Sequence, residues 1–152
     1  MNAPQFGDPE PGRDYPDRPA AFAIVEQDGK IACVEVAWRI EGPEIDLPGG
    51  GLDPGERGAH AAARECGEEA GLKIVASAEP FSCADHYFVN TEGKRNNTRG
   101  QFFEARLEGE APELKIEDDH SLLWLEPLEA IRRLDRDSHA WAVAAWLRRV
   151  KD

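Results

Sequence analysis

A helix that carries small residues along one side is the feature that most restricts how this chain can fold. The pattern predicts a helix from residue 57 or 58 to residue 70, and Gly71 stands where a C-terminal cap belongs. At about 100° per residue, four small apolar residues fall on one side of this helix: Ala59, Ala63, Cys66 and Ala70. Because small side chains allow close approach, we expect this side to pack on a β-sheet.

Three carboxylates, those of Glu65, Glu68 and Glu69, fall on the opposite side of the same helix. Like charges four residues apart destabilise a helix by about 0.2–0.5 kcal/mol per pair, and Arg64 lies only at the edge of the cluster. Most acidic clusters on helices are solvated surface, which is the alternative interpretation. A divalent cation would turn this repulsion into coordination, and Mg²⁺ suits an open set of a few carboxylates.

Short β-rich runs surround this helix. Residues 20–27 and 30–38 are expected to form two strands joined by Asp28-Gly29, a pair typical of a tight hairpin turn. Further strands are expected at 44–47, 73–78, 81–89, 100–107 and 122–125, and further helices at 127–134 and from 137 or 138 to 150. Many strands with a few interspersed helices predict an α/β sandwich of mixed sheet with helices on its faces.

Residues 1–19 differ in composition from the rest, because they carry five of the eleven prolines. Such a segment predicts a flexible arm or an irregular strap across the domain. We therefore expect a flexible proline-rich N-terminal arm at 1–19 and one folded domain at 20–152. The segment lacks a basic start and an apolar stretch, so we do not expect a secretory signal peptide.

The charge and cysteine usage narrow the classes of partner and location. The formal net charge is -12, a surface that repels nucleic acid polymers and anionic lipid. No apolar run approaches the length of a membrane span. The three cysteines are widely spaced without a CxxC pair, which disfavours structural zinc and a disulfide framework. We therefore expect a cytoplasmic location.

The spacing of the segment from Gly50 to Leu72 resembles the Nudix box of the MutT-like Nudix hydrolase family. The box is Gly-x5-Glu-x7-Arg-Glu-U-x-Glu-Glu-x-Gly-U, with U a bulky apolar residue, and this chain matches it without a departure; Cys66 is its least typical occupant. The resemblance implies a Nudix-type α/β/α sandwich with a mixed β-sheet. It also implies Mg²⁺- or Mn²⁺-dependent hydrolysis of a pyrophosphate bond in a nucleoside diphosphate linked to another moiety, with nucleoside triphosphates and dinucleoside polyphosphates as the first classes to screen.

The resemblance assigns roles to the charged residues of the box. Glu65, Glu68 and Glu69 would bind the metal and, with Arg64, form the catalytic set. Glu56 would assist the metal from the preceding loop, mainly by holding Arg64 or an outer-shell water. Arg64 would then orient the glutamates by hydrogen bonding.

A carboxylate must also accept the proton of the attacking water. Glu65 is one possibility. In many family members an acid outside the box is the base or an extra metal ligand. The acids of this chain that could take that role are Glu117, Asp118, Asp119 and Glu104. Each of these is alternatively a solvated surface acid. Among the glycines, Gly50 and Gly51 would allow positive φ and a close approach to the helix, and Gly71 a left-handed turn.

Lys94, Arg95 and Arg99 form the densest basic patch, on a predicted turn between two strands. They could contact a substrate phosphate, or they could serve only the solubility of a hairpin tip. Tyr87 stands roughly where dinucleoside polyphosphate members carry a tyrosine. Trp38, Tyr87 and Phe103 could stack on a base, although aromatic residues on strands are more often core.

A non-catalytic Nudix-fold module that binds nucleotides is the alternative function. Such members usually lose a box glutamate, and this chain keeps Glu56, Glu65, Glu68 and Glu69. We expect a small-molecule nucleotide as partner, no polymer nucleic acid and no membrane, and the sequence leaves a homodimer open.

Overall fold

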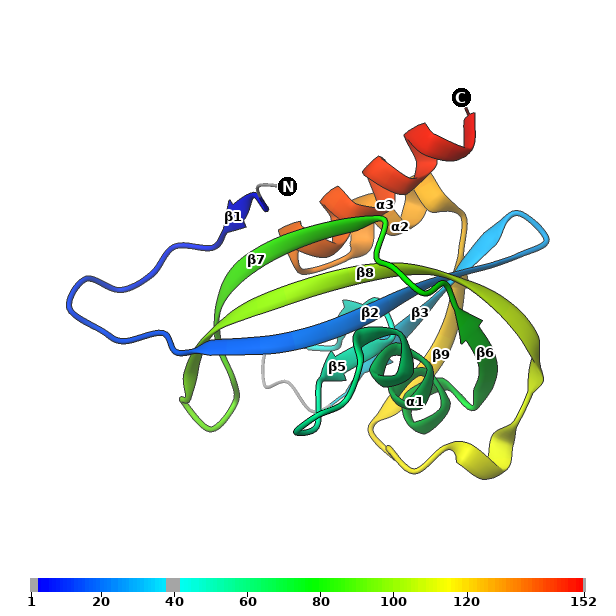
Figure 1. Cartoon of the computed structure of the whole chain (residues 1–152), viewed down its shortest axis with the longest axis horizontal. Coiled ribbons are helices and arrows are strands. Elements are labelled where there is room, and N and C mark those ends of the chain that lie inside the picture. The colour runs from blue at the N-terminus through cyan, green and yellow to red at the C-terminus, as the bar shows by residue number, and fades with distance from the viewer. Residues whose placement is uncertain (1–2, 38–41, 152) are drawn as a thin grey trace.

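The computed structural model describes residues 3–37 and 42–151 as three layers around one mixed sheet. Helix α1 (Gly58–Ala70) covers one face of the sheet, and helices α2 (Pro127–Arg133) and α3 (Asp137–Lys151) cover the other (Figure 1). The predicted α/β/α sandwich is confirmed. No helix in the described part of the chain is long and apolar enough to cross a membrane.

The sheet is mixed because two pairs of its strands run parallel, β2 with β8 and β1 with β7. Its main path is β1 (Gln5–Phe6), β7 (Ser82–Val89), β8 (Arg95–Glu110), β2 (Asp17–Gln27), β3 (Lys30–Val36) and β4 (Glu44–Asp46). Three strands lie off this path: β5 (Gly49–Gly51) pairs with β2, β6 (Leu72–Ala76) with β8, and β9 (His120–Leu125) with β3. A 3-10 turn, η1 (Pro112–Leu114), follows β8.

The central strand β2 is buried on both faces and so contributes to two cores. Phe22 and Ile24 face the core beneath α2 and α3, whereas Ala23 and Val25 face the core beneath α1. Side chains alternate between the faces of a strand, so a continuous apolar run suits a sheet covered on both sides. The Asp28-Gly29 turn closes the β2–β3 hairpin with positive φ at both residues, 53° and 79°, as a two-residue turn of this kind requires.

The predicted packing side of α1 is partly wrong. Cys66 and Ala70 are buried as expected, but Ala59 and Ala63 are only half-buried, while Ala61, Ala62, Gly67 and Glu69 are buried. The physical reason is that α1 contacts β2 and β5 on one side and β6 and β9 on the other, so that more than a narrow stripe is covered. Gly71 ends the helix in the left-handed conformation, and its N–H donates to Gly67 O.

Other element boundaries also differ from prediction. Strand β8 begins at Arg95 rather than residue 100, because its polar first half pairs with β7. The segment 49–51, expected as a loop, pairs with β2 as β5. At the N-terminus, β1 pairs with β7, and Asn97 N donates to Pro16 O. The predicted strand end at Trp38 lies outside the described residues.

Candidate active site

A cleft of about 180 Å³ opens between α1, β5 and the start of β9. We call it the carboxylate cleft, because two of the predicted box glutamates line it. Its lining includes Gly49, Gly50, Glu65, Glu69 and His120.

Glu69 is buried in this cleft, with only 10% of its side chain exposed. Its Oε1 accepts a hydrogen bond from Gly49 N–H at 2.9 Å. The sequence placed Glu69 on a side of α1 away from the packing surface, and this expectation is wrong, since β5 and β9 cover that side. Burial raises the pKa of Glu69 well above its ordinary 4.5, because a buried charge loses its hydration.

Glu65 lies against the glycine segment. A Cβ added to Gly50 would stand 2.9 Å from the Glu65 carboxylate, and one added to Gly51 would stand 2.8 Å from the Arg18 guanidinium. Neither glycine adopts positive φ, so the expectation of positive φ here is wrong and close approach explains both. Burial raises the pKa of Glu65, although Arg64 partly offsets this.

Arg64 connects the glutamates. Its Nε and Nη2 donate to the two oxygens of Glu56 at 2.8 and 2.9 Å, and its Nη1 donates to Glu65 and Glu68 at 3.1 and 3.2 Å. Nη2 also donates to Gly51 O. One guanidinium thereby ties the loop before α1 to two carboxylates of the helix.

Glu56 is fully engaged by this network. Besides Arg64, its oxygens lie at hydrogen-bond distance from Asp53 N–H and His60 Nδ1, and its side chain is 7% exposed. Hydrogen bonds from Arg64 lower the pKa of Glu56 to about 2. This arrangement suits a residue that holds Arg64 in place better than it suits a direct metal ligand.

The donor set of the cleft fits a hard divalent cation. Glu65 and Glu69 are carboxylates forced into a partly desolvated site, and Glu68 stands one turn from Glu65 with 27% of its side chain exposed. A cation would offset the loss of hydration that raises two of these pKa values. Glu65, Glu68 and Glu69 are therefore the residues that would hold it.

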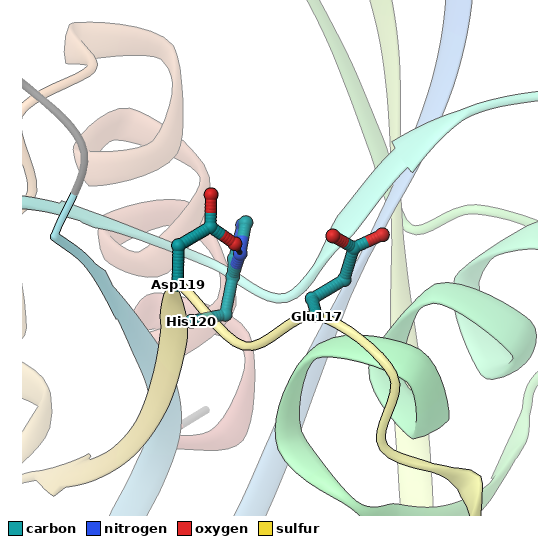
Figure 2. Close-up of side chains that lie close together, drawn as sticks. All are labelled: Glu117, Asp119 and His120. Atoms are coloured by element: carbon teal, nitrogen blue, oxygen red, sulfur yellow. Dashed lines mark hydrogen bonds and ion pairs between the residues drawn. The ribbon is translucent and has the colours of Figure 1, made fainter.

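A second group of ligand atoms lies on the loop before β9 and on the first residue of β9 (Figure 2). Glu117, Asp119 and His120 each offer one atom within 4.8 Å of the others. The loop is anchored to the helix, because Glu117 N–H donates to Glu68 O at 3.0 Å. Asp118 is exposed and is not part of the group.

His120 is a site residue that the sequence did not single out. Its Nε2 lies 3.4 Å from Glu69 Oε2, and its Nδ1 lies 2.8 Å from Asp119 Oδ1. The available signal was its position directly after the acidic run, at the start of a strand. Glu104, by contrast, accepts a hydrogen bond from Arg149 and lines a different hollow, beside Trp146. The structure thus separates Glu104 from the carboxylate cleft.

The basic patch predicted from the sequence is divided by the structure. Lys94 and Arg95 line a hollow of about 490 Å³ next to the carboxylate cleft, which we call the outer hollow. Arg99 lines neither space and forms ion pairs with Asp17 and Asp85. Tyr87 also lines neither space, and its ring packs edge-on against Tyr15. The expectation of one patch on one turn is therefore wrong, because Arg95 and Arg99 lie within β8.

Two further cations, Arg18 and Arg136, line both the carboxylate cleft and the outer hollow. Arg136 Cζ stacks 3.9 Å from the centroid of the Phe88 ring, and its Nε lies 3.5 Å from Asp46 Oδ1. No local motif marks either arginine. They are remote from each other in sequence and meet only through the fold.

Comparisons with known proteins agree with this geometry. A family model described as NUDIX domain matches residues 16–147. A curated "RNA pyrophosphohydrolase" of Agrobacterium fabrum (strain C58 / ATCC 33970) is 40% identical over 78 residues, which cover 47% of this chain and 46% of that protein. The chain therefore matches about half the length of this relative.

Solved structures show the same fold. A NUDIX hydrolase from Nitrosomonas europaea has a TM-score of 0.68 at 20% identity, with 86% of this chain and 88% of that chain covered. A MutT NUDIX hydrolase from Burkholderia pseudomallei has a TM-score of 0.64 at 23% identity, with coverage of 84% and 96%. The E. coli dihydroneopterin triphosphate pyrophosphohydrolase has a TM-score of 0.61 at 15% identity, with coverage of 88% and 97%.

Proposed function

This chain belongs to the NUDIX domain family, and we propose that it is a divalent-metal-dependent hydrolase of a pyrophosphate bond in a nucleoside diphosphate linked to another moiety. The observation that carries the proposal is the carboxylate cleft itself. Glu65 and Glu69 line it, Glu68 stands one turn from Glu65, and the backbone of Gly50 lies directly against the Glu65 carboxylate. A solvated acidic face would not be built around two carboxylates with raised pKa values.

A bound Mg²⁺ or Mn²⁺ would activate a water and neutralise charge on the phosphoryl group. The residues of the chain supply the positioning. Arg64, itself held by Glu56, keeps Glu65 and Glu68 directed toward the cleft. Gly49 N–H fixes one oxygen of Glu69, leaving the other toward His120.

We assign the acceptor of the water's proton to Glu117. Its backbone N–H donates to Glu68 O at 3.0 Å, which places the Glu117 loop against the end of α1 that carries the box carboxylates. A general base must come within hydrogen-bond reach of the reacting water, and the anchored loop of Glu117 satisfies this requirement better than the exposed Asp118. Glu117→Gln is expected to lower kcat far more than KM.

Nucleoside triphosphates and dinucleoside polyphosphates remain the substrates we propose first. Some proteins of the same fold carry substrate names, including an "ADP compounds hydrolase" and the dihydroneopterin triphosphate enzyme. The partial relative is named for RNA. The net charge of -12 opposes binding of a long polyanion, so an RNA 5′ end is tested as a separate arm.

The test is product release with Mg²⁺ and added inorganic pyrophosphatase across nucleoside triphosphates, dinucleoside polyphosphates, ADP-ribose, nucleotide sugars and a 5′-triphosphorylated oligonucleotide. Glu65→Gln should lose at least about 100-fold in kcat, near 2.7 kcal/mol of barrier. The matched control is Glu79→Gln, at an exposed glutamate outside the cleft. Hydrolysis of none of these by the wild type, with nucleotide still bound, would instead identify a non-catalytic binding module.

A further inference from the structure

The carboxylate cleft and the outer hollow are neighbouring spaces that share two lining residues, Arg18 and Arg136. A molecule bound at Glu65 and Glu69 can therefore continue past these guanidiniums into the outer hollow. The outer hollow is the larger space, about 490 Å³ against about 180 Å³. It is large enough to receive a substantial part of a substrate.

Arg18 lies at the junction of the two spaces, over Gly51. It makes no ion pair or side-chain hydrogen bond with residues 3–37 or 42–151. Its guanidinium lies over Gly51, where an added Cβ would approach Nη2 to 2.8 Å. An unpaired guanidinium held beside a pyrophosphate site is suited to bind phosphate oxygens.

The outer hollow presents hydrogen-bond donors. Besides the two shared arginines it is lined by Lys94 and Arg95, with Glu92 as its acid. The side-chain Oδ1 of Asn90 already accepts the backbone N–H groups of Glu92 and Lys94, so the side-chain N–H₂ remains as a donor.

Two cations of the hollow, Lys94 and Arg95, pair with acids whose side chains are exposed. Lys94 lies 3.8 Å from Glu92, and Arg95, which is half-buried, lies 3.1 Å from the exposed Glu10. Surface pairs of this kind contribute little to stability and exchange readily. An anionic ligand can therefore take their place.

We propose that the outer hollow binds a phosphate of the substrate beyond the two of the scissile pyrophosphate, with Arg18 holding the chain of phosphates at the junction. The inference rests on the proposed function. It assigns the protein a substrate with a third phosphate, supplied either by a longer polyphosphate chain or by the phosphodiester of an RNA 5′ end. A nucleoside diphosphate lacks that group.

The first experiment compares three substrates that share one nucleoside: its diphosphate, its triphosphate and a 5′-diphosphorylated dinucleotide. The wild type should favour at least one of the last two over the diphosphate by about 10-fold or more in kcat/KM. Lys94→Ala should reduce that advantage at least about 5-fold through KM. The control Arg106→Ala, at an exposed arginine on β8, should leave it unchanged. The favoured substrate identifies the source of the third phosphate.

Gly51→Ala tests the junction independently of charge. The added Cβ would push the flexible end of Arg18 aside, so KM should rise several-fold for every substrate. In the Arg18→Ala background, which itself should raise KM about 10-fold, Gly51→Ala should add nothing, since interacting positions are non-additive. Additive effects of the two substitutions would contradict a role of Gly51 through Arg18.

Binding of inorganic tripolyphosphate without metal, measured by calorimetry, separates this inference from the proposed function. The wild type should bind it, and Arg18→Ala and Lys94→Ala should each weaken binding at least about 5-fold, with Arg106→Ala unchanged. Equal affinity in all four proteins would overturn the assignment of the outer hollow. A wild type that binds tripolyphosphate and hydrolyses nothing would refute the proposed function alone.

Discussion

Replacing Glu56 with glutamine tests whether this residue acts by holding Arg64. The pKa of Glu56 is lowered from 4.5 to about 2, chiefly by hydrogen bonds from Arg64. At about 1.36 kcal/mol per tenfold change in proton affinity, such a carboxyl stabilises the folded protein by at most about 3 kcal/mol. Because 23% of the Arg64 side chain is exposed and water partly screens the pair, we expect about 1–2 kcal/mol.

The sign of the pH dependence follows from the lowered pKa. Stability from Glu56 is fully present above pH 4.5 and is lost as the pH falls from 4.5 toward 2, where the folded protein also takes up the proton. Glu56→Gln should therefore lower Tm by about 2–8 °C at pH 7, and this deficit should shrink below pH 4.5.

The assay is thermal unfolding followed by circular dichroism at pH 7, 4.5 and 3, in chelator and with Glu79→Gln as control. Activity should fall as well, because Arg64 loses the partner that fixes it. A Tm at pH 7 equal to that of the control, or a deficit that does not shrink below pH 4.5, would refute the role given to Glu56.

Three further substitutions or modifications follow from burial and backbone geometry. Glu69→Gln should abolish turnover yet raise the Tm of the metal-free protein at pH 8. The raised pKa of Glu69 means that the wild type loses stability as the pH rises above 4.5, and a melting series in chelator from pH 5 to 8 should show a shallower loss for the variant, which keeps only Glu65 with a raised pKa on this face. Burial raises the pKa values of Cys33 and Cys66 to about 12, so both thiols should resist a thiol reagent until urea unfolds the protein. The half-buried Cys83 should react first, and equal reaction rates for the three cysteines would argue against the buried positions. Gly29→Ala should cost about 1 kcal/mol, because Gly29 has φ of 79°, and an unchanged urea midpoint would contradict the two-residue turn.

Local patterns predicted most elements of this fold. The helix at 58–70 and its Gly71 cap follow from periodicity and a single glycine, and the β2–β3 hairpin follows from Asp28-Gly29. Exposure along α1 was harder to predict, because it depends on β5 and β9, which are contributed by remote parts of the chain. That is why Glu69 is buried although its spacing placed it on an open side.

The site shows the same division between local and remote information. Glu65, Glu68 and Glu69 share one helix, so their spacing alone brings them together. Arg18 lies on β2, His120 begins β9, and Arg136 precedes α3. These three residues are far apart in the sequence, and only the folded arrangement of the sheet and helices places them on one cleft. No pattern within a short window carries that information.

The central claim is that the carboxylates of α1 form the metal site. Anomalous diffraction from crystals soaked in millimolar Mn²⁺ tests it most directly. Our account predicts a peak within coordination distance of at least two of Glu65, Glu68 and Glu69, and no such peak in Glu65→Gln/Glu69→Gln crystals. A peak held only by Glu117, Asp119 and His120, or no peak at all, would contradict it.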